Sequence, residues 1–234
     1  MITSQHNDKL KLIRRLGRRR TRDRDGLFVG EGEDLLAAAR AAGQEPVELL
    51  TAAGEGLGGT EVEPALLARS SQLGSGTRAI GVWRERWAEA AGAPCVYLHG
   101  VSDPGNVGTV IRIAHGLVGG SVVLGPEAAD PYGPHAVRAS MGAVFAEPLL
   151  RAGIERTPEP RAALVAHGGD SIMALDGVAT VCLGAERAGL PEDVLERCQV
   201  RVTIPLRVGA ESLNVAAAAA IALHRIASAG QSDD

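Results

Sequence analysis

Aromatic residues are scarce in this sequence of 234 residues, in which Phe, Trp and Tyr together make up 3%. We therefore expect a hydrophobic core built from Ala, Val, Leu and Ile. Cysteine is also rare, because Cys95, Cys182 and Cys198 stand far apart and form no CxxC pair. Neither a disulfide framework nor a zinc site is indicated, and no His, Cys and Asp cluster has metal-ligand spacing. We expect reduced thiols and no metal.

Long apolar segments are absent as well. The first ten residues, MITSQHNDKL, contain no apolar stretch of the kind that a secretory signal needs. The apolar run from Val215 to Leu223 is shorter than the roughly 20 residues that cross a membrane. No G-x-G-x-x-G motif follows a predicted strand, which argues against a nicotinamide-dependent dehydrogenase. The sequence predicts a cytoplasmic protein without a membrane span.

Charge is distributed unevenly along the chain, whose net charge is −4. Residues 1–24 contain nine Lys or Arg residues and two Asp residues, a net charge of +7, so the remainder carries −11. A basic block on an acidic chain is typical of proteins that bind a phosphate backbone. A solvated helix surface is the alternative interpretation. The candidate RNA-binding residues are Lys11, Arg14, Arg15, Arg18, Arg19 and Arg20.

Short helix and strand patterns alternate in the first part of the chain. Apolar residues among the cations predict one basic amphipathic helix over residues 8–20. The alternation predicts a small α/β domain over residues 1–83, followed by a helical linker over residues 84–93. Within that domain we expect strands over 26–30, 47–51 and 79–83 and helices over 31–42 and 64–70.

From residue 94 onward, short apolar strands without polar alternation follow one another. This pattern predicts a parallel sheet covered by helices on both faces, in an α/β domain that spans residues 94–234. Loops at the carboxyl ends of such strands are the expected ligand sites. The predicted strands cover 95–99, 121–124, 143–147, 162–166, 180–183 and 200–204, with helices beginning at Thr109 and Pro134.

Three segments of this domain carry residues suited to a ligand site, namely 102–112, 183–191 and 204–226. The third ends in an Ala-rich helix that we expect to be buried on all sides, with Glu211-Ser212 at its N-cap. Asn214 is a polar amide at the mouth of that helix. It either helps to cap the helix or belongs to a functional site.

These segments read DPGNVGTVIR, LGAERAGL and IPLRVGAESLNVAAA, and they resemble, in this order, the three motifs of the SpoU-type RNA 2′-O-ribose methyltransferases, which are TrmH-like members of the SPOUT class. The stretch DPYGPHAVRASMGAVF is similar to the family's intervening segment, and the N-terminal region resembles its small substrate-binding domain. Arg187 departs from the family, in which Gly is frequent at that position. The resemblance implies a deep C-terminal trefoil knot, S-adenosylmethionine as cofactor, and a homodimer with composite active sites.

The resemblance also implies roles for individual residues. Arg112 matches the family's candidate for activating the ribose hydroxyl. A guanidinium has a pKa above roughly 12, so we expect Arg112 to grip a phosphate and stabilise a developing alkoxide rather than to remove a proton. The candidate catalytic residues are Asn106, Arg112, Glu186, Ser212 and Asn214, and the candidate cofactor-binding residues are Leu183, Gly184, Ile204, Leu206, Ser212 and Leu213.

Structural alternatives stay open for three of these residues: a helix-surface ion pair for Arg112, a loop-bracing role for Glu186, and helix capping for Ser212. The function implied is methylation of a ribose 2′-hydroxyl in RNA, with 23S rRNA preferred and tRNA as the alternative. A non-catalytic RNA-binding protein that kept the fold is the second alternative. The intact motif residues favour an enzyme.

Overall fold

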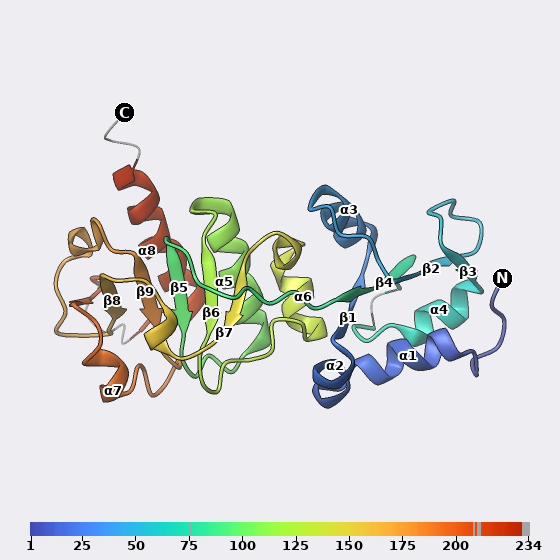
Figure 1. The fold of residues 1–234 in the computed structure, drawn as a ribbon, viewed down its shortest axis with the longest axis horizontal. Helices are drawn as coiled ribbons and strands as arrows, with labels where there is room; N and C mark the ends of the chain where they lie inside the picture. Colours follow the sequence, from blue (N-terminus) through green and yellow to red (C-terminus); the bar gives the residue numbers. More distant parts are fainter. Residues whose placement is uncertain (75, 208, 210–211, 231–234) are drawn as a thin grey trace. The chain divides into compact units, whose positions relative to one another are not determined.

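The computed structural model describes residues 1–74, 76–207, 209 and 212–230 (Figure 1). The chain forms two compact units. Unit 1 comprises residues 1–85 and 130–146, and unit 2 comprises residues 86–129 and 147–234. A segment from the middle of the sequence thus belongs to the same unit as the N-terminal residues. The domain division at residues 83 and 94 stays a prediction.

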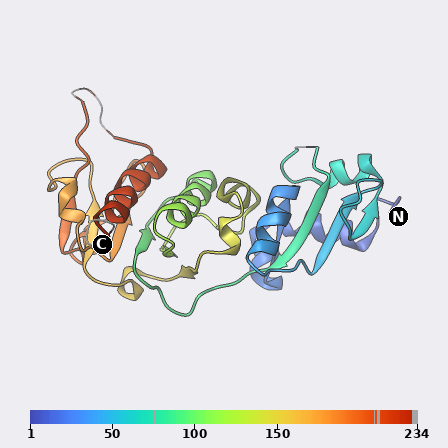
Figure 2. The same cartoon turned by 90° about the horizontal axis from the view of Figure 1, so that it is seen from above.

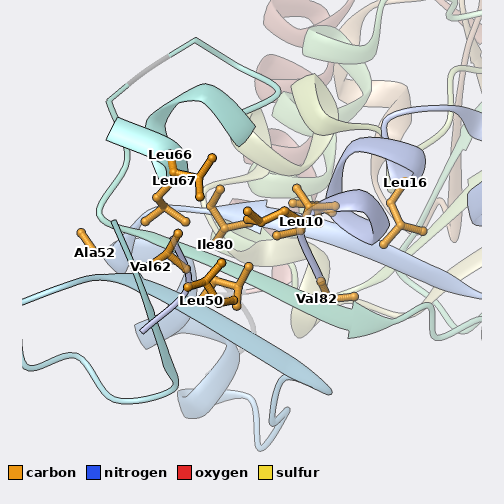
Figure 3. Packing of buried hydrophobic residues seen from close by; sticks show 12 residues of the cluster. Leu10, Leu16, Leu50, Ala52, Val62, Leu66, Leu67, Ile80 and Val82 are labelled. Atoms are coloured by element: carbon orange, nitrogen blue, oxygen red, sulfur yellow. The ribbon is translucent and has the colours of Figure 1, made fainter. Parts of the chain in front are cut away.

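Unit 1 is built on a four-stranded sheet in the order β1-β4-β2-β3. The strands β1 (Leu27–Glu31) and β2 (Glu48–Ala52) pair antiparallel with β4 (Ala79–Arg84), and β3 (Thr60–Val62) runs parallel to β2. The helices α3 (Glu33–Ala41) and α4 (Pro64–Ser70) lie where the sequence predicts them. An apolar cluster between helices and sheet includes Leu10, Leu50, Leu67 and Ile80 (Figure 3).

The basic N-terminal segment forms two helices instead of the single predicted one. The first, α1 (Asp8–Leu16), ends at Gly17, and Arg18 has an extended backbone before α2 (Arg19–Asp25) begins. Glycine is a poor helix former, so the helix stops there although the amphipathic pattern continues. In α1 the apolar Leu10, Ile13 and Leu16 are buried, as the pattern indicates.

Four of the chain's aromatic residues pack together in unit 1, so its core is not purely aliphatic as predicted. The ring centroid of Phe28 lies 4.7 Å from that of Tyr132 and 5.6 Å from that of Phe145, and Trp83 lies 5.0 Å from Phe145. Tyr132 and Phe145 come from the middle segment, which also contains α6 (Pro134–Ser140) and the 3-10 helix η1 (Ala143–Phe145). The aromatic contacts therefore join the middle segment to the N-terminal part of unit 1.

The strand predicted over residues 143–147 is absent from the described structure, because η1 occupies its first three residues. Phe145 instead places its ring in the aromatic cluster, and its carbonyl accepts a hydrogen bond from the Gln44 side chain. These interactions belong to unit 1. They take the place of the strand hydrogen bonds that the apolar run at 143–147 predicts.

A buried ion pair also holds the middle segment. The Arg22 guanidinium donates to Asp130 Oδ2 over 2.6 Å, and the two side chains are only 5% and 6% exposed. Arg22 also donates to the carbonyl of Leu16 over 2.8 Å. Arg22 thus has a structural role in unit 1, whereas the basic residues just before it in the sequence are exposed.

Unit 2 contains a six-stranded sheet in the order β10-β8-β9-β5-β6-β7, and all its strand pairs are parallel, as predicted. The longest helices, α5 (Pro104–Leu117) and α8 (Val215–Gly230), lie against each other and against β6 and β9 (Figure 2). The trefoil knot stays a prediction. The strands are β5 (Cys95–Leu98), β6 (Ser121–Leu124), β7 (Leu149–Arg151), β8 (Arg161–Leu164), β9 (Thr180–Leu183) and β10 (Val200–Val202).

A second set of apolar contacts in unit 2 joins the sheet to short helical elements. Cys95, Tyr97 and Cys182 point from β5 and β9 into a cluster that includes Ile154 of η2 (Ile154–Arg156) and Val194 of α7 (Glu192–Leu195). Successive residues of a strand face opposite sides of a sheet, so Val96 and Leu98 face away from this cluster. Helical elements therefore flank the sheet, as expected. The remaining 3-10 helix, η3 (Ile172–Leu175), contacts α8.

Two local predictions for unit 2 are wrong. Residues 85–93 form no helix. The Ala88 N–H donates to the carbonyl of Leu149 over 2.7 Å, which gives this backbone a partner outside its own segment. The helix predicted from Thr109 begins earlier, at Pro104, because Asp103 accepts from the Asn106 N–H as its N-cap and proline is well suited to the first helical position.

The Ala-rich helix α8 is buried along one side only, contrary to the prediction of burial all round. Its residues Ala219, Ala222 and Leu223 are fully buried, whereas Ile221 is 39% exposed. Among the described residues, no helix is both long and apolar enough to cross a membrane.

Candidate active site

The loops that follow β8, β9 and β10, together with the start of α8, surround a cavity of about 790 Å³ at the carboxyl edge of the unit 2 sheet. Ligands of open parallel sheets bind at this edge, where loops of neighbouring strands come together. The cavity volume lies in the range of small-molecule sites, which is roughly 300–1,000 Å³. All six predicted cofactor-binding residues line it, namely Leu183, Gly184, Ile204, Leu206, Ser212 and Leu213.

The loop after β9 forms a tight turn at the cavity. Ala185 and Gly189 exchange backbone hydrogen bonds of 3.1 and 2.8 Å across it. Gly184 leaves no room for a side chain, since a Cβ there would lie 2.2 Å from the carbonyl carbon of Gly189. Glu186 and Arg187 therefore stand at the exposed tip of a braced turn that lines the cavity.

A chain of hydrogen bonds joins three of the predicted catalytic residues. The Asn106 side-chain amide donates to Glu186 Oε1, and Asn214 Nδ2 donates to Asn106 Oδ1 over 3.0 Å. The three residues come from α5, from the turn after β9 and from the start of α8. Asn106 and Asn214 lie 108 positions apart in the sequence, and the fold of unit 2 brings their side chains into contact.

Asn214 also caps α8, which corrects the predicted N-cap. Its Oδ1 accepts from the N–H of Ala216 over 2.9 Å, which is the contact expected of an N-cap side chain. The helix begins at Val215, so Ser212 lies two residues too early to be the N-cap. Glu211, the other half of that prediction, lies outside the described residues. One amide therefore serves both as helix cap and as donor to Asn106.

The other two predicted catalytic residues, Arg112 and Ser212, are not part of this hydrogen-bonded group. Arg112 lies on α5, is exposed, and does not line the cavity. Within the described ranges it makes no ion pair, so the helix-surface ion pair suggested as an alternative is not seen there. Ser212 lines the cavity and is exposed. A site that unites all four residues around a reacting group stays a prediction.

The loop after β8 is a wall of the cavity that the sequence analysis missed. It contributes Val165, Ala166 and His167. Further along this loop, Gly169 packs closely against the backbone of Val202. A Cβ at Gly169 would lie 2.7 Å from the carbonyl carbon of Val202. This loop matches no motif, and its local signal is the glycine pair at 168–169, two residues after the end of the predicted strand.

Two histidines without an assigned role have structural partners. His99 Nδ1 lies 3.2 Å from the hydroxyl of Tyr97, and His115 Nδ1 lies 2.6 Å from Glu147 Oε1. Burial raises the pKa of Tyr97 to about 12, so its hydroxyl stays protonated at neutral pH. Burial also raises the pKa of Glu147, while the hydrogen bond from His115 acts in the opposite direction. Both pairs support the sheet and helix around the site.

The six predicted RNA-binding residues are all exposed in unit 1. Some of them have local partners: Lys11 pairs with Asp8 over 3.0 Å, and Arg19 lies 3.6 Å from Asp23. Ion pairs this exposed contribute little to stability. The cations are therefore available to a polyanion. In the part of the chain that the structure describes, no three His, Cys, Asp or Glu side chains converge as metal ligands would.

Comparison with known proteins connects this geometry to a family. Residues 93–224 match the model of the SpoU rRNA Methylase family. A curated relative in Mycobacterium bovis, named an uncharacterized tRNA/rRNA methyltransferase, is 38% identical over 149 residues, which are 57% of this chain and 52% of that protein. The chain therefore spans about half the length of that relative.

Solved structures resemble nearly the whole chain. An rRNA methyltransferase from Sinorhizobium meliloti, crystallised with AdoMet bound, is 28% identical with a TM-score of 0.83, covering 96% of this chain and 95% of that one. A structure described as an RNA 2′-O ribose methyltransferase is 28% identical with a TM-score of 0.80, covering 98% and 99% of the two chains. Hydrogen bonds among Asn106, Glu186 and Asn214 join the three loop segments beside the cavity. With a family match over more than half of its length, the chain belongs to the SpoU rRNA Methylase family.

Proposed function

We propose that this protein transfers a methyl group from S-adenosylmethionine to a ribose 2′-hydroxyl of RNA, with ribosomal RNA as the preferred substrate. The observation that carries the proposal is the hydrogen-bonded group of Glu186, Asn106 and Asn214 beside the cavity that all six predicted cofactor residues line. Family membership supports RNA methylation. A similar structure whose description names a 2′-O ribose methyltransferase supports the ribose as acceptor.

The cavity suits the cofactor, which is S-adenosylmethionine, as predicted; a similar enzyme was crystallised with it. The apolar side chains of Leu183, Ile204 and Leu206 offer a surface for a flat base, while Gly184 lets the two sides of the turn approach each other closely. The carboxylate of Glu186 offers a negative charge to a cationic ligand. When bound, S-adenosylmethionine supplies an electrophilic methyl group.

The residues around the cavity position the reactants in this proposal. Glu186 accepts from Asn106, and Asn106 accepts from Asn214, so each amide is held in a single orientation at the edge of the site. Because Asn214 is also fixed to the first turn of α8, the group is anchored to a helix rather than to a free loop. Holding two reactants in line is a large part of a methyl transfer.

Arg112 acts on the RNA in this scheme. Its side chain is exposed on α5, outside the cavity wall, which leaves it accessible to a polymer too large to enter the cavity. A guanidinium binds phosphate in a planar, two-pronged geometry and stays protonated at neutral pH. It therefore holds the RNA backbone and stabilises negative charge that develops on the ribose oxygen.

The proposal assigns RNA affinity to the exposed cations of unit 1 and chemistry to unit 2. It also includes a homodimer with composite active sites. The exposed apolar side chains of Ile221 on α8 and Leu117 on α5 support a partner surface on these helices, because both are more than a third exposed. The cytoplasmic location stays a prediction.

The experiment that tests the proposal follows a tritiated methyl group from S-adenosylmethionine into rRNA and tRNA transcripts. A 2′-O-methyl group blocks alkaline cleavage of the neighbouring phosphodiester, so label on the ribose is recovered in dinucleotides and label on a base in mononucleotides. We expect label in dinucleotides from rRNA. The Arg112→Ala protein serves as the control for contaminating activity.

Three outcomes would contradict the proposal in different ways. Label in mononucleotides would identify a base methyltransferase, and label in tRNA alone would make tRNA the substrate. RNA binding without methyl transfer would favour a non-catalytic RNA-binding protein. Sedimentation equilibrium tests the dimer separately, and a monomer at micromolar concentration would contradict composite active sites.

A further inference from the structure

The charged groups of the cavity are concentrated at one place. Among its described lining residues, the carboxylate and the guanidinium come from consecutive positions, Glu186 and Arg187, at the tip of the turn after β9. Most of the other lining side chains are apolar or small, including Leu164, Leu183 and Ile204. The lining therefore has a charged part and an apolar part.

The two charged side chains differ in the hydrogen bonds and ion pairs that they already make. Glu186 accepts a hydrogen bond from the Asn106 amide. Arg187 is exposed, and no described residue forms an ion pair or side-chain hydrogen bond with it. Unpaired arginines are common on protein surfaces, but this one belongs to the wall of a cavity and rises from a turn that two backbone hydrogen bonds hold in place.

We propose that Arg187 binds the carboxylate of the cofactor's methionine moiety and so selects the intact cofactor over adenosine derivatives that lack this group. The inference rests on the proposed function. S-adenosylmethionine has an apolar base at one end and, at the other, an ammonium and a carboxylate beside the sulfonium. The charged part of the cavity matches that second end, with Glu186 suited to its cations and Arg187 to its anion.

The guanidinium is well suited to this task. It presents N–H donors in a fixed fork that pairs with both oxygens of a carboxylate, and such charge-assisted hydrogen bonds are stronger than neutral ones. The turn reduces the entropy cost of the contact, since the Arg187 backbone is already braced by the Ala185 and Gly189 hydrogen bonds.

Calorimetry of the full chain with two ligands tests this inference. S-adenosylhomocysteine carries the carboxylate, and its decarboxylated form, S-adenosyl-3-thiopropylamine, differs only in lacking it. Arg187→Gln should weaken S-adenosylhomocysteine binding roughly 10- to 100-fold, the scale of removing a hydrogen bond to a charged group. Binding of the decarboxylated ligand should change less than about twofold, because that ligand has no partner for Arg187.

The matched control is Arg197→Gln, which removes the same charge from an exposed residue of unit 2 that does not line the cavity. It should leave both affinities unchanged. Arg187→Lys should restore only part of the S-adenosylhomocysteine affinity, since an ammonium lacks the planar fork. Thermal unfolding of each variant should match that of the unsubstituted protein, because Arg187 is exposed.

Several results would overturn the inference. Equal weakening of both ligands would show that Arg187 shapes the cavity without recognising the carboxylate. Unchanged S-adenosylhomocysteine affinity, with weaker binding of RNA, would assign Arg187 to an RNA phosphate instead. If the unsubstituted protein bound neither ligand, the proposed function itself would fail, and this inference with it.

Discussion

Asn214 donates a hydrogen bond from Nδ2 to Oδ1 of Asn106 over 3.0 Å, while its own Oδ1 accepts from the N–H of Ala216 over 2.9 Å. The two ends of one amide thus serve two different helices. Its oxygen stabilises the start of α8, and its nitrogen orients the Asn106 side chain that reaches Glu186. The capping role and the site role proposed from the sequence as alternatives are therefore compatible.

Substitution of Asn214 separates these two roles. Asn214→Ala should lower the free energy of unfolding by about 1 kcal/mol, since it removes the helix cap. Asn214→Ser should restore most of that stability, because a hydroxyl also caps a helix, but should not restore methyl transfer, because serine is too short to reach Asn106. Urea denaturation and single-turnover kinetics measure the two effects. Equal activity of the Asn214→Ser variant and the unsubstituted protein would remove the hydrogen bond to Asn106 from the mechanism.

Arg112→Ala should lower turnover at least about 100-fold, the scale of losing a positioned electrostatic stabiliser. Its affinity for S-adenosylhomocysteine should stay nearly unchanged, because Arg112 does not line the cavity. Arg112→Lys should recover activity only partly, since the planar fork is lost. Single-turnover methylation and calorimetry provide the two measurements. Near-normal methylation by the alanine variant would exclude Arg112 from catalysis.

Joint replacement of Arg18, Arg19 and Arg20 by Gln should weaken RNA binding and flatten its salt dependence, by roughly 0.7 to 0.9 of a log–log unit for each phosphate that the protein no longer neutralises. Cofactor affinity should not change. Filter binding over a range of salt concentrations gives the slope. The matched control replaces three other exposed arginines of unit 1, Arg40, Arg69 and Arg84, by Gln. The same effect in both triple variants would indicate overall charge rather than a local RNA surface.

Arg22→Ala should destabilise the protein by about 3–5 kcal/mol, because it removes the Arg22 half of a buried, hydrogen-bonded ion pair with Asp130. Arg20→Ala, in the same helix but exposed, should change stability by less than about 0.5 kcal/mol. Urea denaturation of both variants makes the comparison. A similar small effect for both would mean that Asp130 gains another partner or solvent when Arg22 is removed.

Cys198 should be the first thiol to react with iodoacetamide. A hydrogen bond with Cys182 lowers the pKa of Cys198, whereas burial raises the pKa of Cys95 to about 11. The same hydrogen bond, together with burial, raises the pKa of Cys182. The alkylation rate of Cys198 should therefore reach half its maximum at a lower pH than that of an unperturbed thiol. Peptide mass spectrometry identifies the modified residue, and Cys182→Ala should move the midpoint of Cys198 to higher pH.

The sequence predicts the carboxyl-edge cavity well, because parallel strands place their following loops at one edge whatever their order in the sheet. Leu183 and Ile204 therefore meet at the cavity as expected. The same rule places the loop that contains His167 at this edge, since it follows the strand predicted over residues 162–166, but this loop matches no motif and the sequence does not single it out. The cap of α8 was also misplaced, because Ser212 and Asn214 are both good caps and only the observed start of the helix distinguishes them.

Errors in the fold prediction occur where tertiary contacts override local pattern. The apolar run at 143–147 suits a strand, but Phe145 packs against Phe28 and Trp83 from far along the chain. No periodicity reveals such a contact. Ile221 shows a different kind of error. An all-apolar helix predicts complete burial, but the described chain covers only one side of α8 and leaves Ile221 exposed.

The assignment of residues 130–146 to unit 1 has a consequence for synthesis of the protein. The polypeptide passes from one unit to the other after residues 85, 129 and 146. As the chain leaves the ribosome, Phe28 and Trp83 emerge long before Tyr132 and Phe145, and Arg22 emerges long before Asp130. The N-terminal unit therefore cannot complete its core as a first, independent step, and all of α5 and β6 must be translated before that core can close.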